Sequence, residues 1–304
     1  MPFVDWIWIP LVLAAAGAQT IRNGAQRSLV KAAGTLPATF VRFFYGLPFA
    51  VLGLVSVAVT GAAPLPAPQA PFLAWICLGA IAQLAATGFL LKAMELRSFV
   101  VGVAFAKTEI LQIGILSIVL LGEPLTAASA SAMGLATAGV ILLSLQPRAL
   151  QLSAGTPMAS SAVALGLASG AGFALSAVGY RGATLALDAS SPWVAGIYSL
   201  TWAQAIQTAL LGGYLLVRDR PGLMQVIIEW RVSTLAGFMG ALASMGWLTA
   251  FAMRSAVDVR IVGLVEVIYS YGLSRRYFNE PVTARETWGM LLVVAGIVVV
   301  SWRL

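Results

Sequence analysis

The chain lacks histidine, has a single cysteine and carries few charges. Without histidine, imidazole acid–base catalysis, histidine-ligated metal sites and the common nucleophilic triads are excluded. A disulfide within the chain is impossible, and Cys77 lies in an apolar run, where a small buried side chain is the ordinary role. We therefore expect neither an enzyme nor a metal or other cofactor site.

Charged residues make up 10% of the 304 residues and hydrophobic residues 60%, whereas soluble domains carry about a quarter charged residues. So few charges do not cover a water-soluble surface, which makes the lipid bilayer the expected surroundings. The net charge of +7 comes from basic residues scattered singly along the chain. Because no basic stripe or recognised module is present, we expect no nucleic-acid partner.

Runs of about 20 apolar residues, the length needed to cross a bilayer, predict an all-α membrane protein of about ten transmembrane helices. The longest polar stretch, 146–158, is the expected linker between a first half, 1–145, and a second half, 159–304. The predicted helices are 6–28, 36–59, 71–94, 98–121, 126–145, 159–180, 192–217, 230–253, 258–278 and 283–302.

An internal repeat relates the two halves. A shift of 157 positions aligns 83–144 with 240–301 without a gap. The matched positions include Arg97-Ser98 with Arg254-Ser255, Glu109 with Glu266, Glu123-Pro124 with Glu280-Pro281, Thr126 with Thr283, and Gly139 with Gly296. Five helices per half, an odd number, would invert the second half in the bilayer, as in many secondary transporters. Duplication that merely enlarged a membrane domain is the alternative.

The repeated block resembles the drug/metabolite transporter superfamily, in particular its EamA-type ten-helix branch. The resemblance rests on Gly122-Glu123-Pro124-Leu125-Thr126 in the first half, Asn279-Glu280-Pro281-Val282-Thr283 in the second, and Arg42-Phe43 near the start of the second helix. The proline that usually follows the central glutamate in this family is replaced by Ile110 and Val267. We therefore expect helices four and nine to be less kinked than is usual there.

Glu109 and Glu266 are expected near the bilayer centre, where an ionisable group is costly unless it faces the bundle interior. Three residues further on, Gln112 and Tyr269 extend the same helix faces. Two polar faces converging on one cavity would suit coupling to protons or another cation. The alternative is that each glutamate is a structural acceptor for a neighbouring helix.

Other polar residues are also candidates for substrate binding or coupling. Lys107 would bind an anionic group or pair with a carboxylate on another helix. Gln19, Arg22 and Asn23 make helix one unusually polar, so that it either lines the cavity or ends near Thr20. Arg42 is either a carboxylate clamp or structural. The remaining candidates, for which packing is the alternative role, are Gln83, Trp202, Trp247 and Tyr271.

The resemblance implies a secondary transporter in the bacterial inner membrane that exports a small polar metabolite, such as an amino acid, by alternating access. Protons or another ion would be its coupling partner. Both carboxylates together with Lys107 and Arg42 would suit a zwitterionic substrate. A cavity dominated by the glutamates would instead suit multidrug or cation efflux. A channel and an intramembrane enzyme are further alternatives.

Overall fold

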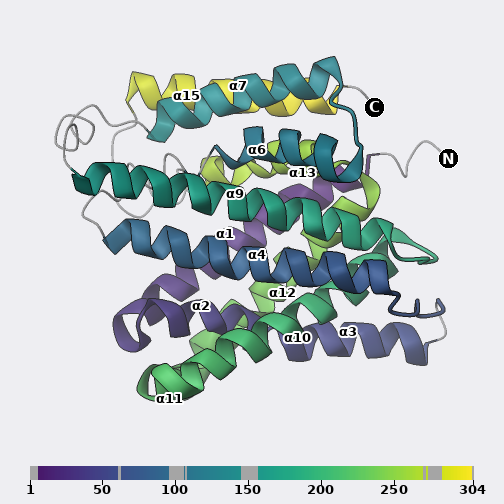
Figure 1. Ribbon diagram of the computed structural model, residues 1–304, viewed down its shortest axis with the longest axis vertical. Coiled ribbons are helices and arrows are strands. Elements are labelled where there is room, and N and C mark those ends of the chain that lie inside the picture. Colours follow the sequence, from purple (N-terminus) through teal and green to yellow (C-terminus); the bar gives the residue numbers. More distant parts are fainter. Residues whose placement is uncertain are drawn as a thin grey trace. The chain divides into compact units, whose positions relative to one another are not determined.

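The computed structural model describes residues 6–60, 63–95, 106, 108–144, 157–269, 272 and 283–302. Within these ranges the chain is helical and contains no strand (Figure 1). Six helices there are long and apolar enough to cross a membrane, namely Thr35–Val59, Ala70–Ala93, Val163–Leu185, Pro192–Arg218, Trp230–Met253 and Ala284–Ser301. The length and composition of these helices are those of an all-α, multi-pass membrane protein.

The helices form two compact units, each of which combines segments from both predicted halves. Unit 1 consists of Met1–Ala80 and Gly179–Arg254, and unit 2 of Ile81–Val178 and Ser255–Leu304. Two helices, α4 (Ala70–Glu95) and α9 (Pro157–Leu185), contribute to both units. Unit 1 further contains α1 (Trp8–Ala33), α2 (Thr35–Phe44), α3 (Leu47–Val59), α10 (Pro192–Arg218), α11 (Arg220–Ile228) and α12 (Trp230–Met253). Unit 2 contains α6 (Glu109–Leu116), the π-helical turn η1 (Ser117–Leu121), α7 (Ala127–Ser144), α13 (Ala256–Gly263) and α15 (Ala284–Ser301).

The second predicted helix, 36–59, is interrupted between α2 and α3. Pro48, in the first turn of α3, has no N–H to donate to the Phe44 carbonyl, and its ring crowds that carbonyl. Gly46 lies at the interruption. A β-carbon there would lie 2.4 Å from the Arg42 carbonyl oxygen and 2.7 Å from Gln204 Nε2. The break therefore lets α10 approach the backbone of α2 closely.

Two observed elements differ from the prediction in extent. Helix α1 continues to Ala33, so the interpretation in which it ends near Thr20 is wrong. Helix α11 was not predicted, because 219–229 contains both charged residues and a Pro-Gly pair. The Asp219 carboxylate starts this helix by accepting a hydrogen bond from Gly222 N at 3.0 Å, a typical N-cap arrangement.

In unit 2, α7 and α15 pack side by side through glycines (Figure 1). A β-carbon at Gly139 would lie 2.6 Å from the Gly289 carbonyl oxygen, and one at Gly296 would lie 2.9 Å from the Ala132 carbonyl oxygen. Gly139 and Gly296 are 157 residues apart, as are Ala132 and Gly289. The contact is thus reciprocal under the repeat offset, which is the pattern that a local two-fold axis produces.

Replacing Gly139 with alanine is expected to lower the free energy of unfolding by about 1–2 kcal/mol, because the new methyl group meets backbone atoms that cannot rotate away. Gly134 lies in the same helix, but a β-carbon there would have no atom within 4 Å. Gly134→Ala should therefore be neutral, or stabilise by up to about 1 kcal/mol through helix propensity. Reversible unfolding in mixed micelles measures both; equal effects would contradict the close packing.

Candidate functional site

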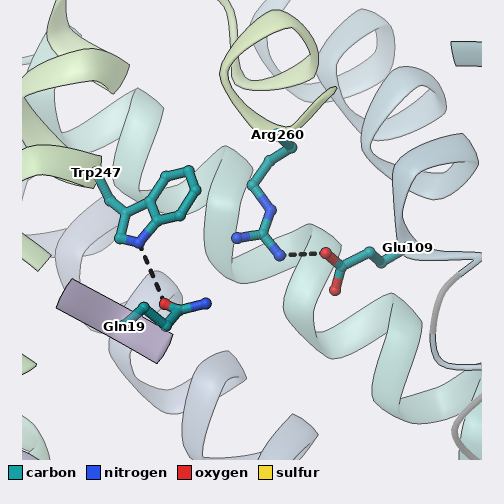
Figure 2. A network of polar contacts seen from close by, with 4 residues as sticks. All are labelled: Gln19, Glu109, Trp247 and Arg260. Carbon is teal, nitrogen blue, oxygen red and sulfur yellow. Dashed lines mark hydrogen bonds and ion pairs between the residues drawn. The ribbon is translucent and has the colours of Figure 1, made fainter. Parts of the chain in front are cut away.

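A buried ion pair lies within unit 2. The Arg260 guanidinium of α13 donates from Nη2 to Glu109 Oε1 at the start of α6 (Figure 2). The Glu109 residue is 7% exposed, and the Arg260 side chain is 25% exposed. A charge-assisted bond in such surroundings is stronger than a neutral one. Breaking it would leave a charge without compensation in a poorly solvated place.

Glu266 acts on the same arginine. Its carboxylate attracts the Arg260 guanidinium electrostatically, alongside that of Glu109. Glu266 is half-buried, in the helical stretch 265–269 that follows α13. The two glutamates matched by the repeat therefore act on one shared cation.

Each glutamate lies at or near the start of a helical segment that follows a turn. Thr108 forms a turn before α6, and Glu109 is the first residue of that helix. Leu264 forms a turn between α13 and the stretch that contains Glu266. The helical path from α13 to Glu266 is thus interrupted at Leu264, although Val267 stands in place of proline. The position of Glu109 stabilises its ionised carboxylate, because the free N–H groups in the first turn of a helix favour a negative charge.

Arg260 was not among the predicted site residues. It lies near the start of the predicted helix 258–278, where an arginine is typical of a membrane-flanking position. The position matched to it by the repeat is Val103, so this cation has no counterpart in the first half. That asymmetry is the signal in the sequence that could have directed attention to Arg260.

Hydrogen bonds to Asp258 hold the start of α13. Ser129 Oγ of α7 donates to Asp258 Oδ1 at 2.7 Å, and Asp258 N donates to Ser255 Oγ at 3.2 Å. Ser129 is itself in the capping turn of α7, where its backbone N–H donates to Thr126 Oγ1 at 3.1 Å. These bonds join α7 to the helix that carries Arg260, and so help to set where its guanidinium lies.

In unit 1, the polar residues of α1 face α12. Trp247 Nε1 donates to Gln19 Oε1 at 3.2 Å, as Figure 2 shows, and the Trp247 residue is only 8% exposed. Arg22 is buried, and its Nε and Nη2 donate to Asn23 Oδ1. Asn23 itself is exposed. Of the polar face predicted for this helix, Arg22 is thus buried and Gln19 is half-buried.

Arg42 lies close to Arg22. A β-carbon at Gly240 of α12 would lie 3.2 Å from Arg22 Cδ and 3.2 Å from Arg42 Cβ. The Arg42 guanidinium lies over the Phe43 ring, 4.4 Å from its centroid. Two arginines, from α1 and α2, therefore meet one glycine of α12.

The other predicted candidates have more local surroundings. Gln112 Nε2 donates to Thr108 Oγ1 at 2.9 Å, within the turn that precedes Glu109. Tyr269 is 36% exposed. Trp202 packs against the rings of Phe72 and Tyr198. Gln83 is half-buried in α4. Lys107 and Tyr271 lie outside the described residues.

Comparison with known proteins supports the fold without indicating a function. One solved crystal structure is similar over 97% of this chain and 96% of its own, with a TM-score of 0.73 and 18% sequence identity. At that identity the similarity concerns the fold alone. No family model matches the chain, and no curated protein matches it significantly.

Proposed function

We propose that this chain is a secondary active transporter of the drug/metabolite type, built from ten transmembrane helices in two inverted five-helix repeats. It exports a small polar metabolite, such as an amino acid, across the bacterial inner membrane by alternating access. Glu109, Glu266 and Arg260 form its coupling centre, where one proton or other cation is exchanged for each substrate moved.

The arrangement of two carboxylates around one guanidinium carries this proposal. An ion pair maintained among apolar helices costs desolvation that hydrophobic side chains would avoid. Ionisable groups in membrane helices mark ion and substrate pathways far more often than they stabilise the fold. Arg260 also offers one cation on which both Glu109 and Glu266 act, which is what an exchange between two states needs.

The helix starts near the two glutamates support the same proposal. In many transporters, discontinuous helices present half-helix ends to the ion and the substrate near the centre of the bilayer. Here α6 starts at Glu109, and the interruption at Leu264 lies two residues before Glu266. The reciprocal contact between α7 and α15 also follows the repeat offset, which supports the inverted-repeat arrangement on which alternating access is based.

Gradient-driven accumulation in proteoliposomes tests the proposal. A panel of labelled amino acids, other small metabolites and cationic dyes would be offered to the wild type with and without a pH gradient. We expect at least one compound to accumulate against its concentration gradient in the wild type. Glu109→Gln and Glu266→Gln are expected to lose accumulation, because glutamine keeps the shape of glutamate but binds no proton.

A third variant, Glu229→Gln, is the matched control. Glu229 flanks α12, is half-buried and makes no side-chain hydrogen bond that caps this helix, and it should be replaceable without effect on accumulation. Accumulation that survives in both Glu109→Gln and Glu266→Gln would remove the glutamates from the coupling mechanism. Unsaturable flux without accumulation would make the protein a channel, and accumulation of cationic dyes alone would favour multidrug efflux.

A further inference from the structure

Arg42 presents two buried hydrogen-bond donors that no atom of the described residues accepts. These donors are Nε and Nη2. Burying a charged donor without an acceptor is costly, and a purely structural arginine would be expected to find a carbonyl or carboxylate. The chain does supply such partners elsewhere, since Arg22 uses the same two atoms to bind Asn23 Oδ1.

The two donors have the geometry of a carboxylate site. Nε–H and Nη2–H lie on the same edge of a planar guanidinium and point in parallel, which matches the two oxygens of a carboxylate in a bidentate pair. The Phe43 ring lies against the face of the guanidinium, so it accepts no hydrogen bond from this edge, and the two donors remain buried without an acceptor among the described residues. Stacking on an aromatic ring also orients the group before a ligand arrives.

A second buried polar group without a partner, on α10, contacts the end of the helix that carries Arg42. Gln204 of α10 is 2% exposed, and its Oε1 has no hydrogen-bond donor among the described residues. Its Nε2 approaches Gly46, four residues after Arg42. Tyr180, whose hydroxyl accepts a hydrogen bond from Gln207 Nε2 at 3.1 Å, interacts electrostatically with the Arg42 guanidinium. An anion donor edge and a neutral acceptor therefore occur together within unit 1.

We propose that Arg42 and Gln204 form a subsite for a zwitterionic amino acid, in which Arg42 binds the α-carboxylate and Gln204 Oε1 accepts from the ammonium group. This inference rests on the proposed transport function and names its substrate class. A phosphate or a simple carboxylic acid would satisfy Arg42 but leave the amide oxygen without a donor. A lipophilic cation would satisfy the amide oxygen but be repelled by Arg42 and Arg22.

Equilibrium binding to the purified protein tests this subsite without any gradient. The thermal unfolding midpoint would be followed by tryptophan fluorescence with each of the twenty L-amino acids. Each stabilising compound would then be compared with the amine that lacks its carboxylate and with the acid that lacks its amino group. We expect at least one amino acid to raise the midpoint, and both of its truncated analogues to raise it much less at equal concentration.

Variants locate the binding on the protein. Arg42→Lys keeps the positive charge but loses the two parallel N–H donors of the guanidinium. We expect this variant to bind the stabilising amino acid about 10- to 100-fold more weakly. Arg231→Lys is the matched control. Like Arg42, Arg231 lies over the ring of a residue adjacent in the chain, here Trp230, but Arg231 is exposed. It should bind like the wild type.

Three results would overturn the subsite. They are the absence of any stabilising amino acid, equal stabilisation by the amine that lacks the carboxylate, or unchanged affinity in Arg42→Lys. The comparison of analogues uses the wild type only, so a poorly folding variant does not prevent a decision. Accumulation of cationic dyes with no amino-acid binding would leave the transporter proposal standing while this inference fails. Amino-acid binding without gradient-driven accumulation would support the subsite while the transporter proposal fails.

Discussion

Replacing Arg260 with methionine is expected to lower the free energy of unfolding by about 3–5 kcal/mol, because removing one partner of a buried ion pair strands the other. Methionine is apolar and unbranched, so it fills much of the same space without a charge. In proteoliposomes the same variant should lose gradient-driven accumulation, since Glu109 and Glu266 would then face each other's charge without a shared cation. Unfolding in mixed micelles and the transport assay measure the two effects.

A double variant separates the charge effect from the loss of packing. In Arg260→Met combined with Glu109→Gln, the stranded carboxylate is gone, so part of the lost stability should return. Transport should not return, because both partners of the ion pair are missing. Arg231→Met, at an exposed position, should change neither quantity. If the double variant were less stable than Arg260→Met, the cost would not come from an uncompensated charge.

Gly237→Ala is expected to destabilise unit 1 by about 3 kcal/mol, at the upper end of the range for overpacked cores. A β-carbon at Gly237 would lie 2.4 Å from Tyr45 Cβ and 2.6 Å from the Tyr45 carbonyl carbon. Neither atom can move without displacing the chain between α2 and α3. The contact lies next to Gly46, so the displacement should also reach Arg42.

Gly213→Ala in α10 is the matched control for this prediction. A β-carbon at Gly213 would have no atom within 4 Å, so alanine there should be neutral, or stabilise by up to about 1 kcal/mol through helix propensity. The measurement is the free energy of unfolding of Gly237→Ala and of Gly213→Ala, each compared with the wild type. Comparable stability of Gly237→Ala and the wild type would mean that the α2–α12 contact is looser than the structure has it.

Several helices followed from the sequence closely. The predicted segments 230–253 and 192–217 correspond to α12 and α10, because long uncharged apolar runs bounded by charges or proline leave little choice of boundary. Thr126 and Thr283, matched by the repeat, both cap the last helix of their half, through Ser129 N and Glu286 N respectively. A capping residue and the N–H group that it binds lie within one helical turn, so caps of this kind can be predicted from the sequence.

The partners of the candidate residues were much less predictable. Arg260 and Glu109 are 151 residues apart in the chain, and no periodicity in either helix relates them. Trp247 and Gln19 are similarly distant. The interruption before Glu266 was also not expected, since Val267 does not break a helix.

By itself, then, the sequence determined the membrane environment, the helical class and the positions of the costly charges. Each of these depends on local composition, because lipid demands apolar helices wherever the chain crosses it. Only the tertiary structure decided which charge meets which. Both Glu109 and Glu266 act on Arg260, and Arg42 has two buried donors without an acceptor among the described residues. Helix packing decides this, because it brings distant residues together through small side chains and glycines whose partners the sequence does not name.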